Sequence, residues 1–156
     1  MESKTNVMRI LEKAKIKYNF LECSNEPFVS AEEICKNLKI DPNKDFKTLV
    51  TIGKSHMNYV FCIPASKTLV LKKAAKVVNE KNIEMILLKD LLKTTGYIHG
   101  GCSPIGMKKQ FKTVFDISAK NYETIYFSAG KVNEVVEVNV MDIQKVIPCL
   151  FEDITK

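Results

Sequence analysis

The chain has 156 residues, of which 46% are hydrophobic and 27% are charged, and 24 basic residues stand against 18 acidic ones. These values exclude a disordered, collagen-like or coiled-coil chain, and a domain of this length buries enough surface to need neither a disulfide nor a metal ion for stability. The sequence shows no signal-peptide-like start and no apolar run of about 18 residues, so we expect a cytoplasmic protein made of a single domain, residues 1–156.

The periodicity of apolar residues predicts alternating helices and short strands along the chain. In chain order, we expect a helix over 6–15, a strand over 18–21, a helix from Ser30 to Asp41, a hairpin of strands 46–52 and 57–63, a helix over 71–78, a strand over 83–87, a helical turn at 89–93, strands over 111–115, 124–127 and 135–138, and a helix over 140–147. Ser30 and Glu33 form a capping box, because each can hydrogen-bond the main chain of the other.

This order of elements predicts a mixed α/β fold with about six or seven strands. Closure of the sheet into a small barrel flanked by helices would remove its open edges, so we expect a closed or nearly closed barrel.

The cysteines predict free thiols rather than a metal site or disulfides. Their spacing matches neither a zinc ribbon nor a redox pair, and only two histidines are present. We therefore expect no metal and no cofactor, and small buried apolar roles for the five cysteines: Cys23, Cys35, Cys62, Cys102 and Cys149.

All of the positive excess comes from two windows without acidic residues, 46–79 and 91–115. A surface that faces a polyanion would produce this distribution, although solvated helix faces could produce it as well.

Residues 95–106 read TGYIHGGCSPIG and contain four glycines and a proline. This composition predicts a loop rather than a helix or a strand. Glycines let main-chain amides converge on an anion or a developing oxyanion, although a bulged connection between strands is the alternative.

Three blocks together resemble the YbaK/EbsC family, free-standing relatives of the editing domain of bacterial prolyl-tRNA synthetases: FKTL at 46–49, TGYIHGGCSPIGMKK at 95–109 and TIYFSAGK at 124–131. The resemblance implies the YbaK fold of aminoacyl-tRNA synthetase-associated domains. It also implies a deacylase that removes cysteine wrongly attached to proline tRNA or carried by cysteine tRNA, with prolyl-tRNA synthetase as an expected partner.

The resemblance also suggests the residues of the site. By the family pattern, Lys47 is the residue on which activity should most depend. From the composition of the loop, the amides of Gly100 and Gly101, with that of Ser103 beside them, are the candidate oxyanion donors. The candidate substrate-binding residues are Thr48, Ser103, Pro104, Gly106, Ser128, Gly130 and Lys131. The candidate tRNA-backbone contacts are Lys72, Lys73, Lys108 and Lys109.

The resemblance further implies that the thiol of the attached cysteine attacks its own ester and that the protein supplies position and charge. His99 as a general base is an alternative route. The chain departs from the family pattern at Cys23, Val132, Asn133 and Val135, which bear on the aminoacyl preference. Removal of alanine or another small residue from proline tRNA, and a binding module without catalysis, therefore stay open.

Overall fold

The structure is a computed structural model that describes residues 4–23 and 30–156. Its helices and strands within these residues, in chain order, are α1 (Asn6–Lys13), β1 (Tyr18–Glu22), α2 (Ala31–Leu38), β2 (Phe46–Gly53), β3 (Asn58–Pro64), α3 (Leu71–Val77), β4 (Ile83–Met85), η1 (Leu88–Asp90), α4 (Leu91–Thr95), β5 (Lys112–Asp116), η2 (Ile117–Asn121), β6 (Thr124–Ser128), β7 (Glu134–Asn139), η3 (Val140–Lys145) and β8 (Cys149–Glu152).

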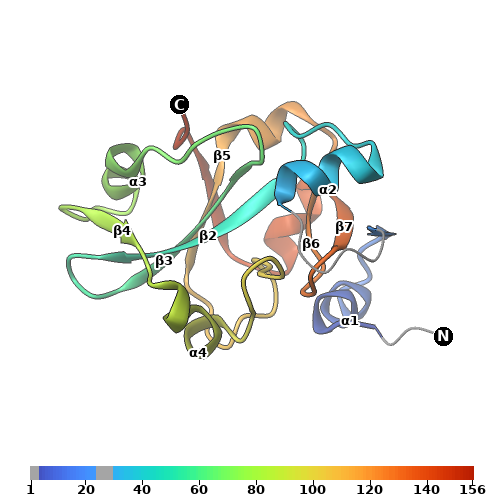
Figure 1. Cartoon of the computed structure of the whole chain (residues 1–156), viewed down its shortest axis with the longest axis horizontal. Coiled ribbons are helices and arrows are strands. Elements are labelled where there is room, and N and C mark those ends of the chain that lie inside the picture. The colour runs from blue at the N-terminus through green and yellow to red at the C-terminus, as the bar shows by residue number, and fades with distance from the viewer. Residues whose placement is uncertain (1–3, 24–29) are drawn as a thin grey trace.

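The strands form two sheets. The smaller sheet has the order β1-β7-β6 and is antiparallel throughout. The larger sheet has the order β4-β2-β3-β5-β8, with antiparallel pairs around β2 and parallel pairs on either side of β5. Figure 1 shows α3 beside the β4 end of the larger sheet and α2 over the smaller sheet.

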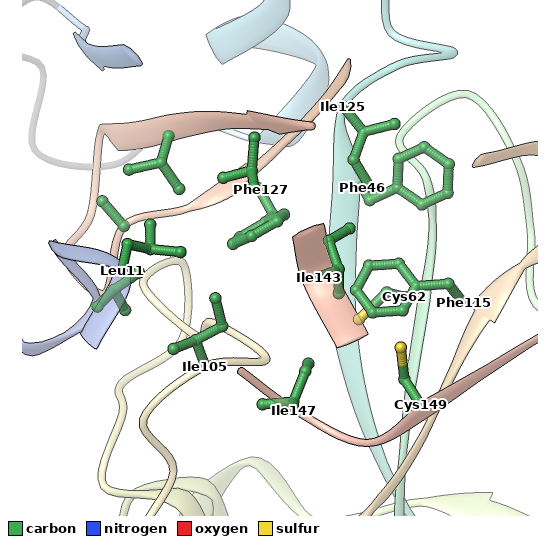
Figure 2. Packing of buried hydrophobic residues seen from close by; sticks show 14 of the residues in the cluster. Leu11, Phe46, Cys62, Ile105, Phe115, Ile125, Phe127, Ile143, Ile147 and Cys149 are labelled. Atoms are coloured by element: carbon green, nitrogen blue, oxygen red, sulfur yellow. The ribbon is translucent and has the colours of Figure 1, made fainter. Parts of the chain in front are cut away.

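The two sheets enclose the main core. The labelled side chains in Figure 2 come from both sheets, from α1, from η3 and the residues that follow it, and from the loop after α4, and they pack into one cluster. Phe46 and Phe115 of the larger sheet and Ile125 and Phe127 of the smaller one are at most 1% exposed. A second cluster lies between α3 and the opposite face of the larger sheet. Burial of these side chains is the main force that holds the layers together.

The expected barrel is wrong, although the mixed α/β class is confirmed. Neither sheet closes on itself: β4 and β8 are the outer strands of one sheet, and β1 and β6 those of the other. The sheets meet through an isolated parallel bridge between Asp45 and Tyr126. Closure depends on pairing between distant strands, which local patterns do not encode.

All seven predicted strands are present, and the structure adds β8, which the sequence pattern missed after Pro148. The hairpin of β2 and β3 forms as predicted. At the start of α2, the Ser30 hydroxyl accepts from the Glu33 amide at 3.2 Å, as the capping box predicts. The final helix is a 3-10 segment, η3, rather than an α-helix.

The five cysteines are free thiols, as expected. Four of them are buried, whereas Cys102 is only partly buried. In the part of the chain that the structure describes, no helix is long and apolar enough to cross a membrane.

Candidate active site

A cavity of about 660 Å³ opens along β2, in the region where the two sheets meet. Four walls surround it. They are the start of α2, Asp45 with residues 46–50 of β2, the segment from β4 to α4, and a wall made by the glycine-rich loop together with the turn between β6 and β7. The volume lies within the range of small-molecule sites in proteins. Apolar side chains such as Met85, Ile86 and Leu91 provide much of the lining.

Lys47 lines this cavity from β2. Its ammonium donates a hydrogen bond to the Ala65 carbonyl oxygen, with 3.4 Å between the two atoms. The ion pairs among residues 4–23 and 30–156 are Lys4–Glu12, Lys73–Asp153, Lys93–Asp90 and Lys145–Asp142. Lys47 belongs to none of these pairs, and its charge acts on the buried Asp45 carboxyl two residues earlier.

Asp45, two residues earlier, adds a buried carboxyl group that the sequence analysis did not select. It lines the cavity, is 6% exposed and accepts a hydrogen bond from the Cys35 thiol, with 3.4 Å between Sγ and Oδ2. Burial raises the pKa of Asp45 to about 6, against the opposing effects of the Cys35 hydrogen bond and the Lys47 charge. A negative charge beside Lys47 therefore develops only near neutral pH.

The glycine-rich loop reaches the cavity through His99, Gly100 and Cys102. Gly100 has φ +88°, a left-handed conformation that glycine adopts without steric cost. The Gly101 amide, in contrast, donates to the Ile98 carbonyl within the loop, with 3.0 Å between nitrogen and oxygen. Of these two predicted oxyanion donors, Gly100 lies at the cavity and Gly101 has a partner inside the loop.

Gly101 also marks a close contact between main chains. A β-carbon at this position would lie 3.1 Å from the carbonyl carbon of Lys131 and 3.1 Å from the amide nitrogen of Val132. The loop therefore rests directly on the turn between β6 and β7, and the absence of a side chain at Gly101 permits this approach.

Ser103, Pro104 and Gly106 shape the loop but do not line the cavity. Ser103 is fully buried, and its hydroxyl accepts from the Ile105 amide at 3.3 Å. Gly106 has φ +83°, and a β-carbon there would collide with the Tyr97 hydroxyl. These residues therefore stabilise the conformation of the loop.

Tyr97 is a second residue that the sequence analysis missed. Its hydroxyl donates to the Ile105 carbonyl, and Ile105 is 1% exposed in the main core. The Tyr97 ring also lies against Gly130, whose φ is +101°. Tyr97 thus ties the loop to the core and to the turn between β6 and β7.

From the remaining predicted substrate-binding set, Thr48 and Ser128 line the cavity, whereas Gly130 and Lys131 do not. The Ser128 hydroxyl accepts from the Gly130 amide at 3.0 Å, which fixes the turn. Lys131 is exposed on the turn.

His99 lines the cavity, so the structure leaves the general-base alternative in place. Burial raises the pKa of the Cys102 thiol to about 12. That thiol stays protonated at neutral pH and is a poor nucleophile.

The four predicted tRNA-backbone lysines separate into two groups. Lys108 and Lys109 are exposed beside the glycine-rich loop, where the Lys108 ammonium lies 3.5 Å from the Lys93 carbonyl oxygen. Lys72 and Lys73 lie on α3. Lys73 contacts the Asp153 carboxylate at 3.1 Å and the Thr155 carbonyl at 2.8 Å, so its charge already has partners.

Two positions that depart from the family pattern, Cys23 and Val135, pack together with Ile34 in one apolar cluster. Ile34 and Val135 also line the cavity. The part of the cavity wall that Ile34 and Val135 form is therefore apolar. Val132 and Asn133 lie in the neighbouring turn, and Asn133 lines the cavity with φ +68°.

Among the described residues, no group of three or more His, Cys, Asp or Glu side chains is placed to hold a metal ion. The arrangement offers an ammonium group, a buried carboxyl group and main-chain donors around an apolar cavity, which suits binding and polarising an ester.

Two comparisons of sequence agree with this arrangement. The sequence model of the aminoacyl-tRNA editing domain family matches residues 25–146. The chain is 44% identical over 155 residues to EbsC of Enterococcus faecalis, which is named as a Cys-tRNA(Pro)/Cys-tRNA(Cys) deacylase; the match covers 99% of this chain and 94% of that protein.

Solved structures share the fold at low sequence identity. The hypothetical protein APE2540 has a TM-score of 0.88 at 17% identity, and the match covers 97% of this chain and 100% of that one. A protein described as a trans-editing enzyme for prolyl-tRNA synthetase has a TM-score of 0.83 at 18% identity, and the match covers 99% of both chains. The sequence match spans all four walls of the cavity, and this chain belongs to the aminoacyl-tRNA editing domain family.

Proposed function

We propose that this protein is an aminoacyl-tRNA deacylase that removes cysteine wrongly attached to proline tRNA, and cysteine from cysteine tRNA. The observation that carries the proposal is that Lys47 and Gly100, which come from separate blocks of the family pattern, line the same cavity. The family match and the name of the 44% identical relative support the same activity.

Cleavage in this site needs no protein nucleophile. The substrate thiol loses its proton, its sulfur bonds to the ester carbonyl carbon, and the bond from that carbon to the ribose oxygen breaks. The ribose oxygen takes up a proton, so the products are a tRNA with a free terminal hydroxyl and a cyclic thiolactone of cysteine, which water opens. Attack within one bound molecule benefits from proximity, which can be worth about 7–11 kcal/mol.

Each candidate residue has a defined role in this proposal. The Lys47 ammonium contacts the ester region or the phosphate of the terminal adenosine, and the Gly100 amide donates to the developing oxyanion. Thr48 and Ser128 border the aminoacyl group. Gly101, Ser103, Pro104, Gly106 and Gly130 hold the loop and the turn in position, and Lys131 meets the ribose or a phosphate.

We propose further that residues 1–156 act as one domain and that the tRNA is delivered by prolyl-tRNA synthetase. One protein that shares this fold is described as a trans-editing enzyme for that synthetase, which supports this partner. Lys72, Lys108 and Lys109 contact the tRNA backbone without reading its sequence.

A deacylation assay tests the function. The purified protein is incubated with proline tRNA that carries cysteine, alanine or serine, with and without the synthetase. We expect fast loss of cysteine, because serine and alanine lack the attacking thiol. Equal cleavage of the serine ester would show attack by water, preferred cleavage of the alanine ester would change the substrate, and no cleavage of any ester would identify a binding module.

A further inference from the structure

The outer edge of β2 contains a gap in its strand pairing. At its far end, β4 pairs with Thr51, Ile52 and Gly53, and the Ile86 amide donates to the Val50 carbonyl. Just before its start, the Tyr126 amide of β6 donates to the Lys44 carbonyl. In Figure 1, β4 lies at one end of β2 and β6 near the other. Among the described residues, no strand pairs with this edge between these two points, and the cavity lies there.

The register of β2 shows which main-chain groups face the gap. The Gly53 amide donates to Met57 across the hairpin, and the Asp45 carbonyl accepts from Ala65, which follows β3. The carbonyl oxygens of Lys44 and Val50 face the opposite way, toward β6 and Ile86. Because N–H and C=O groups alternate between the two edges of a strand, the N–H and C=O of Thr48 point outward into the gap.

This pair of groups matches an aminoacyl ester. The ester carries an α-ammonium group, a donor, and a carbonyl oxygen, an acceptor, on either side of one α-carbon. Two residues that face each other in an antiparallel pair exchange both hydrogen bonds in this way. We propose that the aminoacyl group binds as a one-residue β-strand at Thr48, whose carbonyl accepts from the α-ammonium and whose amide donates to the ester carbonyl. This inference rests on the proposed function.

The pairing also orients the rest of the substrate. In an antiparallel pair the ester end lies toward the amide of Thr48 and hence toward the start of β2. Lys47, whose ammonium contacts the carbonyl of Ala65, lies on that side. The ribose and the terminal phosphate therefore extend toward Lys47, and the α-ammonium lies toward Ile86.

The pairing selects the stereochemistry of the substrate. Residues directly opposite in a pair place their side chains on the same face of the sheet. The side chain of an L-aminoacyl group therefore lies on the Thr48 face, where the Thr48 hydroxyl lies 3.8 Å from Cys62 Sγ. A D-aminoacyl group that keeps both hydrogen bonds directs its side chain to the opposite face, the face of Lys47.

Replacement of Thr48 by its α-hydroxy acid analogue tests the pairing, because it removes the outward N–H and keeps the side chain. We expect kcat/KM for cysteinyl proline tRNA to fall on the order of 10²-fold, the usual effect of losing one such donor. The same replacement at Thr51, which lies outside the cavity lining, is the matched control. It removes an N–H that faces β3, so activity per folded molecule should stay within threefold of the native protein, with the folded fraction measured by circular dichroism.

A second measurement uses the native protein alone. L-cysteinyl proline tRNA should be cleaved at least 10-fold faster than the D-cysteinyl form. If the native protein is active, either of two results would overturn the pairing and leave the proposed function standing. One is an unchanged rate for the Thr48 replacement, and the other is equal cleavage rates for the two enantiomers. A native protein that cleaves no aminoacyl ester would overturn both. Preferred cleavage of the alanine ester would overturn the cysteine specificity alone, since every aminoacyl ester presents the same two groups.

Discussion

Gly101 and Lys131 come into main-chain contact: a β-carbon at Gly101 would lie 3.1 Å from the Lys131 carbonyl carbon. The two nearest atoms, the Lys131 carbonyl carbon and the Val132 amide nitrogen, belong to the backbone and cannot rotate away. We expect Gly101→Ala to separate the glycine-rich loop from the turn between β6 and β7. The free energy of unfolding should fall by about 1–3 kcal/mol, as in overpacked sites. Because both segments line the cavity, kcat/KM should fall too. Thermal melting and a deacylation assay measure these effects, and native values for both would contradict the contact.

Lys47→Ala removes the cation of the cavity. We expect kcat to fall on the order of 10²–10³-fold, because a preorganised charge acts where negative charge develops in the transition state. Far-UV circular dichroism should be unchanged, since Lys47 forms none of the ion pairs among the described residues. Lys145→Ala is the matched control, a lysine paired with Asp142 in η3. Turnover of the Lys47 variant at the native rate would remove this residue from the mechanism.

Lys72 on α3 and the two lysines beside the loop, Lys108 and Lys109, should control how tRNA binding depends on salt. For Lys72→Ala, Lys108→Ala and Lys109→Ala, we expect the slope of log K against log salt to become shallower by about 0.7–0.9 for each lost phosphate contact. Lys73→Ala should change the slope less, because its ammonium must first leave Asp153 and Thr155. Filter binding at several salt concentrations measures these slopes, and a Lys73 effect as large as the others would contradict this ranking.

Ionisation of the buried Asp45 carboxyl should lower the free energy of unfolding as pH rises. Its pKa is raised from 3.8 to about 6 in the folded protein, so the folded state holds a proton that the unfolded state has released. The stabilisation is present below about pH 4 and is lost as pH rises through about 6, a change of about 3 kcal/mol for two pKa units. Asp45→Asn cannot ionise and should lack this loss.

Denaturant unfolding of both proteins between pH 4 and pH 7 measures the difference. The native protein should lose stability relative to the Asn variant across this range. Parallel pH profiles would show that Asp45 has an ordinary pKa in the folded protein.

Local patterns predicted the elements well and their assembly poorly. The hairpin of β2 and β3 follows from neighbouring residues, as does the Ser30 cap of α2. The β8 strand was missed because its four residues follow Pro148 and pair with distant β5. The barrel was wrong for the same reason, since it depends on pairing between strands far apart in sequence.

In the site, too, local patterns predicted some residues, whereas others depend on contacts between distant parts of the chain. Family blocks pointed to Lys47, Thr48, Gly100 and Ser128, which all line the cavity. Asp45 carries no motif of its own, and its importance comes from burial beside Cys35 of another element. A carboxylate directly before the FKTL block was the one signal available. Tyr97 lay inside the glycine-rich block, but its role depends on a contact with Gly130, which no spacing rule encodes.

The β2 strand pairs with β4 near its end, and Asp45, just before β2 begins, forms a bridge to Tyr126 of β6. Each sheet therefore supplies a part of the same binding surface. Loss of either sheet removes a wall of the cavity. A partly unfolded molecule should therefore be inactive, so that heat or destabilising mutations reduce the rate of ester cleavage without extending it to other aminoacyl-tRNAs.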